Sequence, residues 1–166
     1  MSSVVQVFRY RIMIKTKVLF LCTHNSARSQ MAEGLLRHYY GDRYEAFSAG
    51  ATPTKLNPLA VKVMEEIGID ISGQSSKSIE DIRGRDIDVV VTVCKNTPRL
   101  SCPFCSTPLS AGRPDIIRSN IPGAKQWVEH GFDDPSDVEG SEEEKVRAFR
   151  STRDEIRNWV LRYFSN

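Results

Sequence analysis

Short apolar runs alternate along the chain with segments whose apolar residues recur every three or four positions. Residues 17–22 and 88–93 are continuous apolar runs bounded by polar residues, and the second is β-branched almost throughout, which is typical of buried strands. Residues 45–48 and 125–129 form shorter, more mixed runs, and we expect two further strands there. The hydrophobic pattern therefore predicts about four strands.

Helical spacing fills much of the sequence between these runs. We expect a helix over residues 28–40, and a second that begins with the N-cap Asn57 and ends at Gly68. A short helix is expected at 79–83. Residues 141–144 form a capping box that opens a final helix. Its apolar stripe consists of Val146, Phe149, Ile156, Val160 and Phe164.

Strands that alternate with helices favour an α/β fold with parallel strands. We expect a single-domain open parallel sheet of about four strands, flanked by helices on both faces. Ligands bind beyond the carboxyl ends of the strands in such sheets. Cys22 and Cys94 stand at the ends of two expected strands. The sequence therefore predicts two thiols at the same edge of the sheet.

The chain length of 166 residues suits one domain, which we place at residues 17–166. Residues 1–16 are interpreted as an N-terminal extension, and because Met13 is an alternative start, it stays open whether residues 1–12 belong to the native protein. Residues 95–123 are rich in proline and cysteine, which predicts a long irregular segment within the domain.

The composition is that of an ordinary globular protein, with 40% hydrophobic and 27% charged residues. A net charge of +2 gives no reason to expect a nucleic acid partner. No apolar run approaches the roughly 20 residues that span a bilayer, and early basic residues argue against a secretory signal. We expect a cytoplasmic monomer that binds neither nucleic acid nor membrane. In that reducing compartment, four cysteines are more often catalytic, metal-binding or buried than structural disulfides.

The loop from Cys22 to Arg28 is the strongest candidate for chemistry. Five residues between a cysteine and an arginine, at a strand–loop–helix junction, can curl their backbone N–H groups around an oxyanion. Arg28 can bind two oxygens of that anion, and the same positive field favours the Cys22 thiolate. The alternative is a buried cysteine near a capping arginine by accident. The expected oxyanion-binding and supporting residues are Thr23, His24, Asn25, Ser26, Ala27 and Ser29, with Asn25 suited to a left-handed conformation.

Residues 22–34, Cys-Thr-His-Asn-Ser-Ala-Arg-Ser-Gln-Met-Ala-Glu-Gly, resemble the anion loop (CX5R, or P-loop) of the low-molecular-weight phosphotyrosine phosphatase superfamily. They are most similar to the arsenate reductases of that fold, which thioredoxin regenerates. Residues 48–50, 68–71 and 133–135 resemble further family landmarks in the right order, so the resemblance covers residues 17–164. Gln30 is typical of the reductases, where phosphatases more often have proline.

The resemblance implies a low-molecular-weight phosphatase-like fold and a role in arsenic detoxification. It makes Cys22 the nucleophile on arsenate (phosphate and sulfate share its geometry), Arg28 an oxyanion ligand and Asp134 the general acid, with Asp133 as a lesser candidate. From the residues alone, Asp-Asp-Pro is a common turn. Pro135-Ser-Asp137 lacks the aromatic residues that line a phosphotyrosine pocket, which counts against an aryl phosphate substrate.

The resemblance also assigns a disulfide relay to the later cysteines. Cys94 is expected to attack Cys22 and release arsenite, and Cys102 or Cys105 is expected to resolve Cys94. We favour Cys102, and thioredoxin, glutaredoxin or another dithiol then reduces the last disulfide. The rival interpretation is a zinc site formed by these three cysteines and His130, although a single CxxC pair is a weak zinc signal.

The resemblance finally implies that some family members bind potassium beside the loop. Asn25, Glu33 and Ser48 match that site, but Lys77 stands where an acidic ligand is expected. We therefore predict that the ammonium group replaces the ion, with no metal or other cofactor bound. Two alternatives to a reductase stay open: a phosphatase that uses only Cys22, Arg28 and Asp134, and a non-enzymatic sensor that binds zinc or arsenite.

Overall fold

The computed structural model describes residues 14–95 and 121–166. Within these ranges the protein contains one four-stranded sheet in the order β2-β1-β3-β4, and all its paired strands are parallel. The strands are β1 (Thr16–Cys22), β2 (Tyr44–Gly50), β3 (Val89–Cys94) and β4 (Gln126–Phe132). The open parallel sheet is thus confirmed. Strands β2 and β4 extend beyond the expected limits, because pairing with a neighbouring strand continues past their apolar residues.

The α-helices of the described residues begin at the positions that the sequence predicts, and two of them follow a side-chain cap. They are α1 (Arg28–Tyr40), α2 (Pro58–Glu65) and α4 (Glu142–Tyr163), with the 3-10 helices η1 (Glu80–Ile82) and η2 (Pro135–Asp137). The Asn57 side chain accepts a hydrogen bond from Leu59 N, 2.9 Å away, as an N-cap should. Both hydrogen bonds of the capping box between Ser141 and Glu144 are present.

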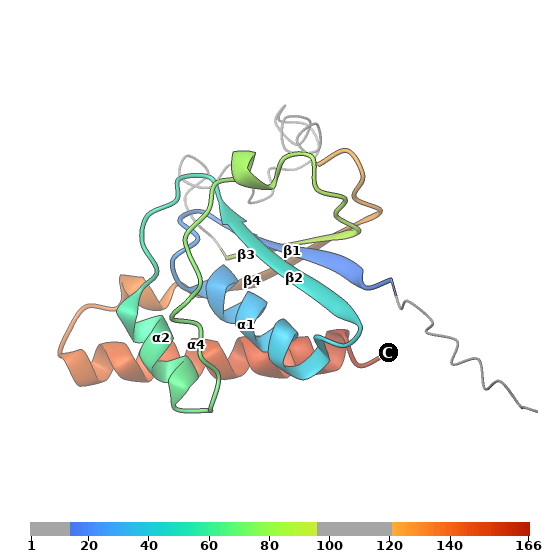
Figure 1. The fold of residues 1–166 in the computed structure, drawn as a ribbon. Coiled ribbons are helices and arrows are strands. Elements are labelled where there is room, and N and C mark those ends of the chain that lie inside the picture. Colours follow the sequence, from blue (N-terminus) through green and yellow to red (C-terminus); the bar gives the residue numbers. More distant parts are fainter. Residues whose placement is uncertain (1–13, 96–120) are drawn as a thin grey trace, which may run out of the picture.

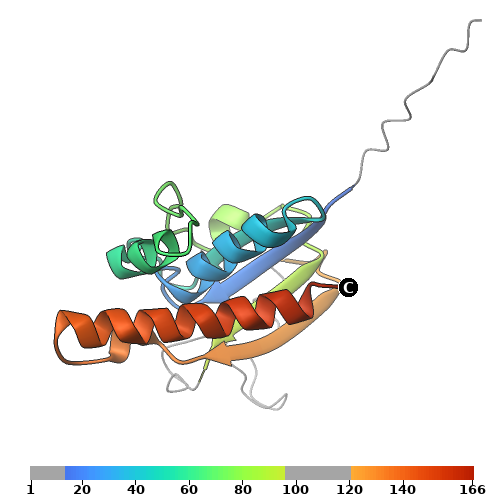
Figure 2. The same ribbon diagram turned by 90° about the horizontal axis from the view of Figure 1, so that it is seen from below.

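The three α-helices of the described residues cover one face of the sheet, and η1 lies on the other (Figure 1). Seen from below, α4 runs alongside α1 and α2 (Figure 2). Phe20 and Phe149 lie in the core on the α-helical face, while Leu21 and Ile82 lie in the core on the opposite face. We expected helices on both faces, and in the described part of the chain the second face carries only this single helical turn.

The parallel order brings the ends of three strands to one edge of the sheet. Strand β1 occupies a central position, and Leu21 pairs with Ala49 of β2 and with Thr92 of β3. Cys22 therefore emerges beside Cys94, the last residue of β3, and β4 delivers the segment that follows Phe132 to the same edge. No helix in the described ranges is long and apolar enough to cross a membrane.

Parts of the expected domain organisation lie outside the described residues. These parts are most of the N-terminal extension and most of the segment 95–123, with Cys102 and Cys105 in it.

Candidate functional site

The Cys22 sulfur lies at the base of the loop between β1 and α1. The residue is only 3% exposed. Asn25 N donates a hydrogen bond to its Sγ over 3.1 Å, and Ser29 Oγ lies 2.9 Å from the same sulfur. Ser29 belongs to the first turn of α1, whose positive end faces the loop. The thiol thus sits among groups that stabilise a negative charge.

The loop backbone is held with its carbonyl oxygens turned outward. Three of them accept hydrogen bonds from the segment after β2: Thr23 O from Thr52 N, His24 O from Thr54 N, and Ser26 O from Asn57 N, at 2.8, 3.1 and 2.9 Å. Because the N–H groups of these peptides point the opposite way, they face the interior of the loop. Asn25 has a φ of 48°, the left-handed conformation expected from the sequence. Ala27 is buried and His24 is exposed, and within residues 14–95 and 121–166 His24 forms neither an aromatic ring contact nor an ion pair.

Arg28 and Asp134 meet across this loop although they are 106 residues apart. Arg28 is 3% exposed, its Nη1 donates to Phe132 O over 3.0 Å, and its Nη2 forms an ion pair with the Asp134 carboxylate. Asp134 is also the N-cap of η2, where its Oδ1 accepts from Ser136 N. Asp133 instead pairs with Lys95, 3.1 Å away, and its side chain is 76% exposed. The geometry thus places Asp134, and not Asp133, against the arginine of the loop.

Cys94 is half-buried and lies against the loop. Its sulfur is 3.7 Å from Thr23 Oγ1, so the two thiols predicted for one edge of the sheet do lie at that edge. Cys102 and Cys105 fall outside the described residues, and the structure therefore does not test their roles. Among the described residues, no group of three or more His, Cys, Asp and Glu side chains is placed to hold a metal ion.

Lys77 lies where the sequence predicted an ammonium group in place of a cation. Its Nζ is 3.7 Å from Glu33 Oε2, and Ser48 Oγ donates to the same carboxylate oxygen. The backbone N–H of Lys77 donates to Asn25 Oδ1 over 2.8 Å. The four residues are therefore neighbours behind the loop, and Glu33, only 7% exposed, is paired with a fixed positive charge.

Two residues that support the loop were missed as such by sequence reasoning. Gln30 is completely buried and donates to Asn25 O, Asn25 Oδ1 and Ser75 O. Gly50 lies so close to the loop that a Cβ there would be 2.8 Å from Asn25 N and 2.9 Å from Thr23 O. A glutamine that follows the Arg-Ser pair and a glycine that ends a strand are the only signals the sequence offers for them.

His130 belongs to an aromatic group on the β4 side of the site. Its ring stacks on Trp159 with centroids 5.0 Å apart and meets Phe132 edge-on. Burial, together with the nearby Arg162 charge, lowers the pKa of His130 below its ordinary value of 6.5. The stack supports Phe132, whose carbonyl oxygen accepts from Arg28.

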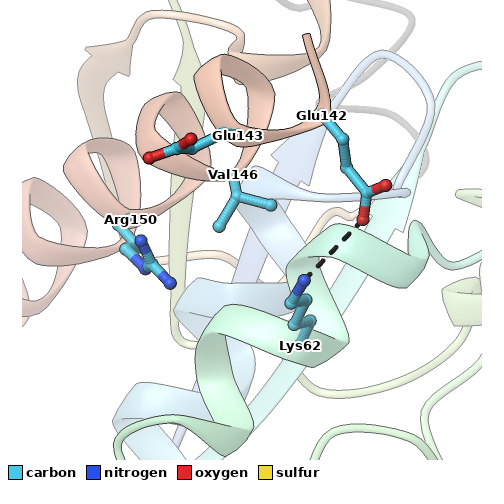
Figure 3. A pocket seen from close by; sticks show the side chains of 5 residues that line it. All are labelled: Lys62, Glu142, Glu143, Val146 and Arg150. Atoms are coloured by element: carbon cyan, nitrogen blue, oxygen red, sulfur yellow. Dashed lines mark ion pairs between the residues drawn. The ribbon is translucent and has the colours of Figure 1, made fainter.

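A separate surface pocket lies between α2 and the start of α4 (Figure 3). It is lined by Lys62, Glu142, Glu143, Val146 and Arg150, and Lys62 forms an ion pair with Glu142 over 3.8 Å. No residue of the Cys22–Arg28 loop lines it. The pocket therefore belongs to the contact between the two helices and is distinct from the thiol site.

The sheet and the loop define a class of protein in which a strand–loop–helix junction presents a cysteine to a tetrahedral oxyanion. Residues 17–165 match the model of the family called low molecular weight phosphotyrosine protein phosphatase, and the chain belongs to this family. The fold class and the family resemblance of the sequence are thus confirmed.

Similar proteins within the family are named arsenate reductase. The protein of Halalkalibacterium halodurans is 44% identical over 144 residues, 87% of this chain and 91% of that protein. The Bacillus subtilis protein is 45% identical over 141 residues, 85% of this chain and 89% of that protein. A solved structure described as an arsenate reductase in reduced state has a TM-score of 0.66 and 29% sequence identity, and the likeness covers 90% of this chain and 97% of that one.

Proposed function

We propose that this protein reduces arsenate to arsenite with Cys22 as the nucleophile and Cys94 as the second thiol. The observation that carries the proposal is the position of Cys94. A phosphatase needs one thiol, yet the sulfur of Cys94 lies 3.7 Å from the Oγ1 of Thr23, a residue of the anion-binding loop. The arsenate reductases at 44% and 45% identity support this substrate.

In the first step, the Cys22 thiolate attacks the arsenic of an arsenate held by the loop amides and Arg28. A sulfur–arsenic bond forms, one As–O bond breaks, and Asp134 supplies the proton with which that oxygen leaves as water. The contact between Arg28 and Asp134 places the anion ligand and the carboxyl group side by side, and Asp134 must take up a proton before it can give one to the leaving oxygen. The loop amides and α1 stabilise the negative charge that the reacting group carries.

In the second step, the Cys94 thiolate attacks the Cys22 sulfur. A disulfide forms between the two cysteines, the electron pair of the sulfur–arsenic bond stays on arsenic, and arsenite leaves in the As(III) state. Two electrons have thus moved from the two thiols to arsenic. Cys102 or Cys105 then attacks Cys94 and frees the Cys22 thiol, and thioredoxin or another dithiol reduces the final disulfide.

The remaining parts of the proposal concern the setting of the reaction. The protein acts in the cytoplasm as a monomer and takes up no metal or other cofactor, since thiols supply the electrons. Phosphate and sulfate compete with arsenate for the loop because they share its tetrahedral shape.

The proposal is tested by arsenite formation from arsenate with thioredoxin, thioredoxin reductase and NADPH. We expect turnover by the wild type and none by Cys94→Ser, while Cys94→Ser retains any hydrolysis of an aryl phosphate. Cys22→Ser serves as the control that loses both reactions. Wild-type protein that makes no arsenite with any dithiol donor, or a Cys94→Ser variant as active as the wild type, contradicts the relay.

A phosphatase is the second candidate, because Cys22, Arg28 and Asp134 provide a complete set of groups for phosphate ester hydrolysis. Brisk hydrolysis of an aryl phosphate without arsenate reduction favours it. The third candidate, a sensor that binds zinc or arsenite, predicts stoichiometric zinc in the purified protein.

A further inference from the structure

A continuous chain of hydrogen bonds runs from the surface to Cys22 through the side-chain amides of two glutamines and an asparagine. Exposed Arg37 donates to Gln74 Oε1 over 2.5 Å. Gln74 Nε2 donates to Gln30 Oε1 over 2.6 Å, and Gln30 Nε2 donates to Asn25 Oδ1 over 3.0 Å. Gln30, the central member, is completely buried, and the direct contacts of the sulfur do not include it.

Backbone groups fix the direction of every bond in this chain. Because the N–H of Lys77 is a donor, the Asn25 atom that it contacts at 2.8 Å is the oxygen Oδ1. The carbonyl oxygens of Ser75 and Asn25 are acceptors, so the Gln30 atom 2.9 and 3.0 Å from them is the nitrogen Nε2. If either side-chain amide were rotated by 180°, its nitrogen would face a donor or its oxygen would face an acceptor.

The fixed directions determine where the hydrogen of Ser29 goes. Asn25 Nδ2 donates to Ser29 Oγ over 2.8 Å, which occupies that oxygen as an acceptor. The only hydroxyl hydrogen of Ser29 is then left for the Cys22 sulfur, 2.9 Å away. With Asn25 N as a second donor at 3.1 Å, the sulfur receives two hydrogen bonds, which favour its negative form.

Asn25 needs external support to make both contributions. Its left-handed backbone conformation, with φ at 48°, is better tolerated by asparagine than by most residues, yet it is less favourable than the right-handed one. Gln30 holds this residue at two points, the backbone carbonyl oxygen and the side-chain Oδ1, both at 3.0 Å. One buried side chain therefore restrains both the peptide and the amide that act on the thiol.

We infer that Gln30 is a positioning residue for the nucleophile: it holds Asn25, and through Asn25 it directs two hydrogen-bond donors, Asn25 N and Ser29 Oγ, at the Cys22 sulfur. The inference rests on the proposed role of Cys22 as a thiolate nucleophile. It assigns to the buried amide of Gln30 a part in setting how much of the thiol is ionised at a given pH.

The test is the rate at which iodoacetamide alkylates Cys22 at different pH values, followed by mass spectrometry of the peptide that contains it. Gln30→Met keeps the length of the side chain and removes its donors. Because weaker hydrogen bonds to the sulfur leave less of the reactive thiolate, we expect the rate at mildly acidic pH to fall about tenfold. At alkaline pH, where every thiol is ionised, the rate should equal that of the wild type. Gln126→Met, in which an exposed glutamine loses its bond to Tyr163, is the matched control.

Equal pH profiles for Gln30→Met and the control overturn the inference, and so does a rate that falls equally at all pH values, which reports altered access. If Gln30→Met does not fold, NMR of the wild-type protein tests the same inference. The side-chain amide signal of Gln30 should shift as Cys22 ionises and should stop shifting in Cys22→Ser. If the chemical shift of the Gln30 side-chain amide does not change when Cys22 ionises, the inference is also overturned.

The alkylation experiment needs no arsenate. Wild-type protein that fails to form arsenite while Gln30→Met shows the expected pH profile contradicts the reductase proposal and leaves the positioning role intact. If the wild type forms arsenite but Gln30→Met and Gln126→Met have the same pH profile of alkylation, the positioning role is contradicted and the reductase proposal stands.

Discussion

Replacement of Gly50 by alanine tests how closely the strand β2 must approach the anion-binding loop. Gly50 pairs with Cys22 in the sheet, and its N–H donates to Lys77 O over 2.8 Å. A Cβ at this position meets Asn25 N at 2.8 Å and Thr23 O at 2.9 Å. Both neighbours are backbone atoms, so no side-chain rotation relieves the contact.

The size of the effect follows from these distances. For Asn25 N to reach ordinary contact at about 3.4 Å, the loop must move by several tenths of an ångström, and the hydrogen bond from this N–H to Cys22 Sγ, now 3.1 Å, must lengthen or bend. Overpacking costs about 1–3 kcal/mol, and the lower entropy of the unfolded chain with alanine offsets about 0.4–1 kcal/mol. We expect a net loss of about 1–2 kcal/mol in the free energy of unfolding.

The catalytic effect should be larger than the loss of stability implies. Losing the hydrogen bond from Asn25 N to a charged sulfur removes about 1.5–3 kcal/mol, which corresponds to about 10- to 100-fold in the rate of attack. Urea denaturation gives the stability, and single-turnover arsenite formation with excess enzyme gives the rate. Gly73→Ala is the control, because its added Cβ has no heavy atom within 4 Å. If Gly50→Ala matches Gly73→Ala in both assays, the loop tolerates the methyl group and the reasoning is refuted.

Two further predictions concern fixed charge and pH. Because the Lys77 ammonium lies 3.7 Å from Glu33, initial rates should be equal in potassium and sodium chloride, and Lys77→Met should become faster in potassium; a wild type that requires potassium contradicts this. Since the pKa of His130 is lowered by burial and by Arg162, the folded state takes up a proton less readily than the unfolded state. As the pH falls through 6.5, the free energy of unfolding should therefore decrease, and His130→Phe, which keeps an aromatic ring, should reduce this decrease in urea titrations; an unchanged pH dependence in that variant counts against it.

Much of the fold could be predicted because its determinants are local. The β-branched run before Cys94 and the capping box at Ser141 each specify an element through neighbouring residues, and both elements are present. The limits of β4 were less accurate. Its last residues, Glu129 to Phe132, are not a continuous apolar run, and they join the sheet because β3 offers backbone partners.

In the candidate site, too, residues fixed by local sequence could be predicted, and residues that depend on distant contacts could not. Cys22, Arg28 and the left-handed Asn25 could be placed from one short segment, because loop, helix start and conformational preference are all local. The support from Gln30 could not, since its acceptor Ser75 is 45 residues away. The need for glycine at position 50 was equally hidden, because only the folded sheet brings it against the loop.

The pairing of Cys94 at the end of β3 has a thermodynamic consequence for the proposed relay. Val93 and Cys22 belong to the core on the α-helical face, whereas Cys94, one residue on, contacts the cores on both faces. Cys94 also pairs with Phe132 of β4 next to an irregularity in the register. Any part of this pairing that a disulfide between Cys22 and Cys94 weakens disfavours that disulfide, so the sheet contributes to how readily the oxidised protein is reduced.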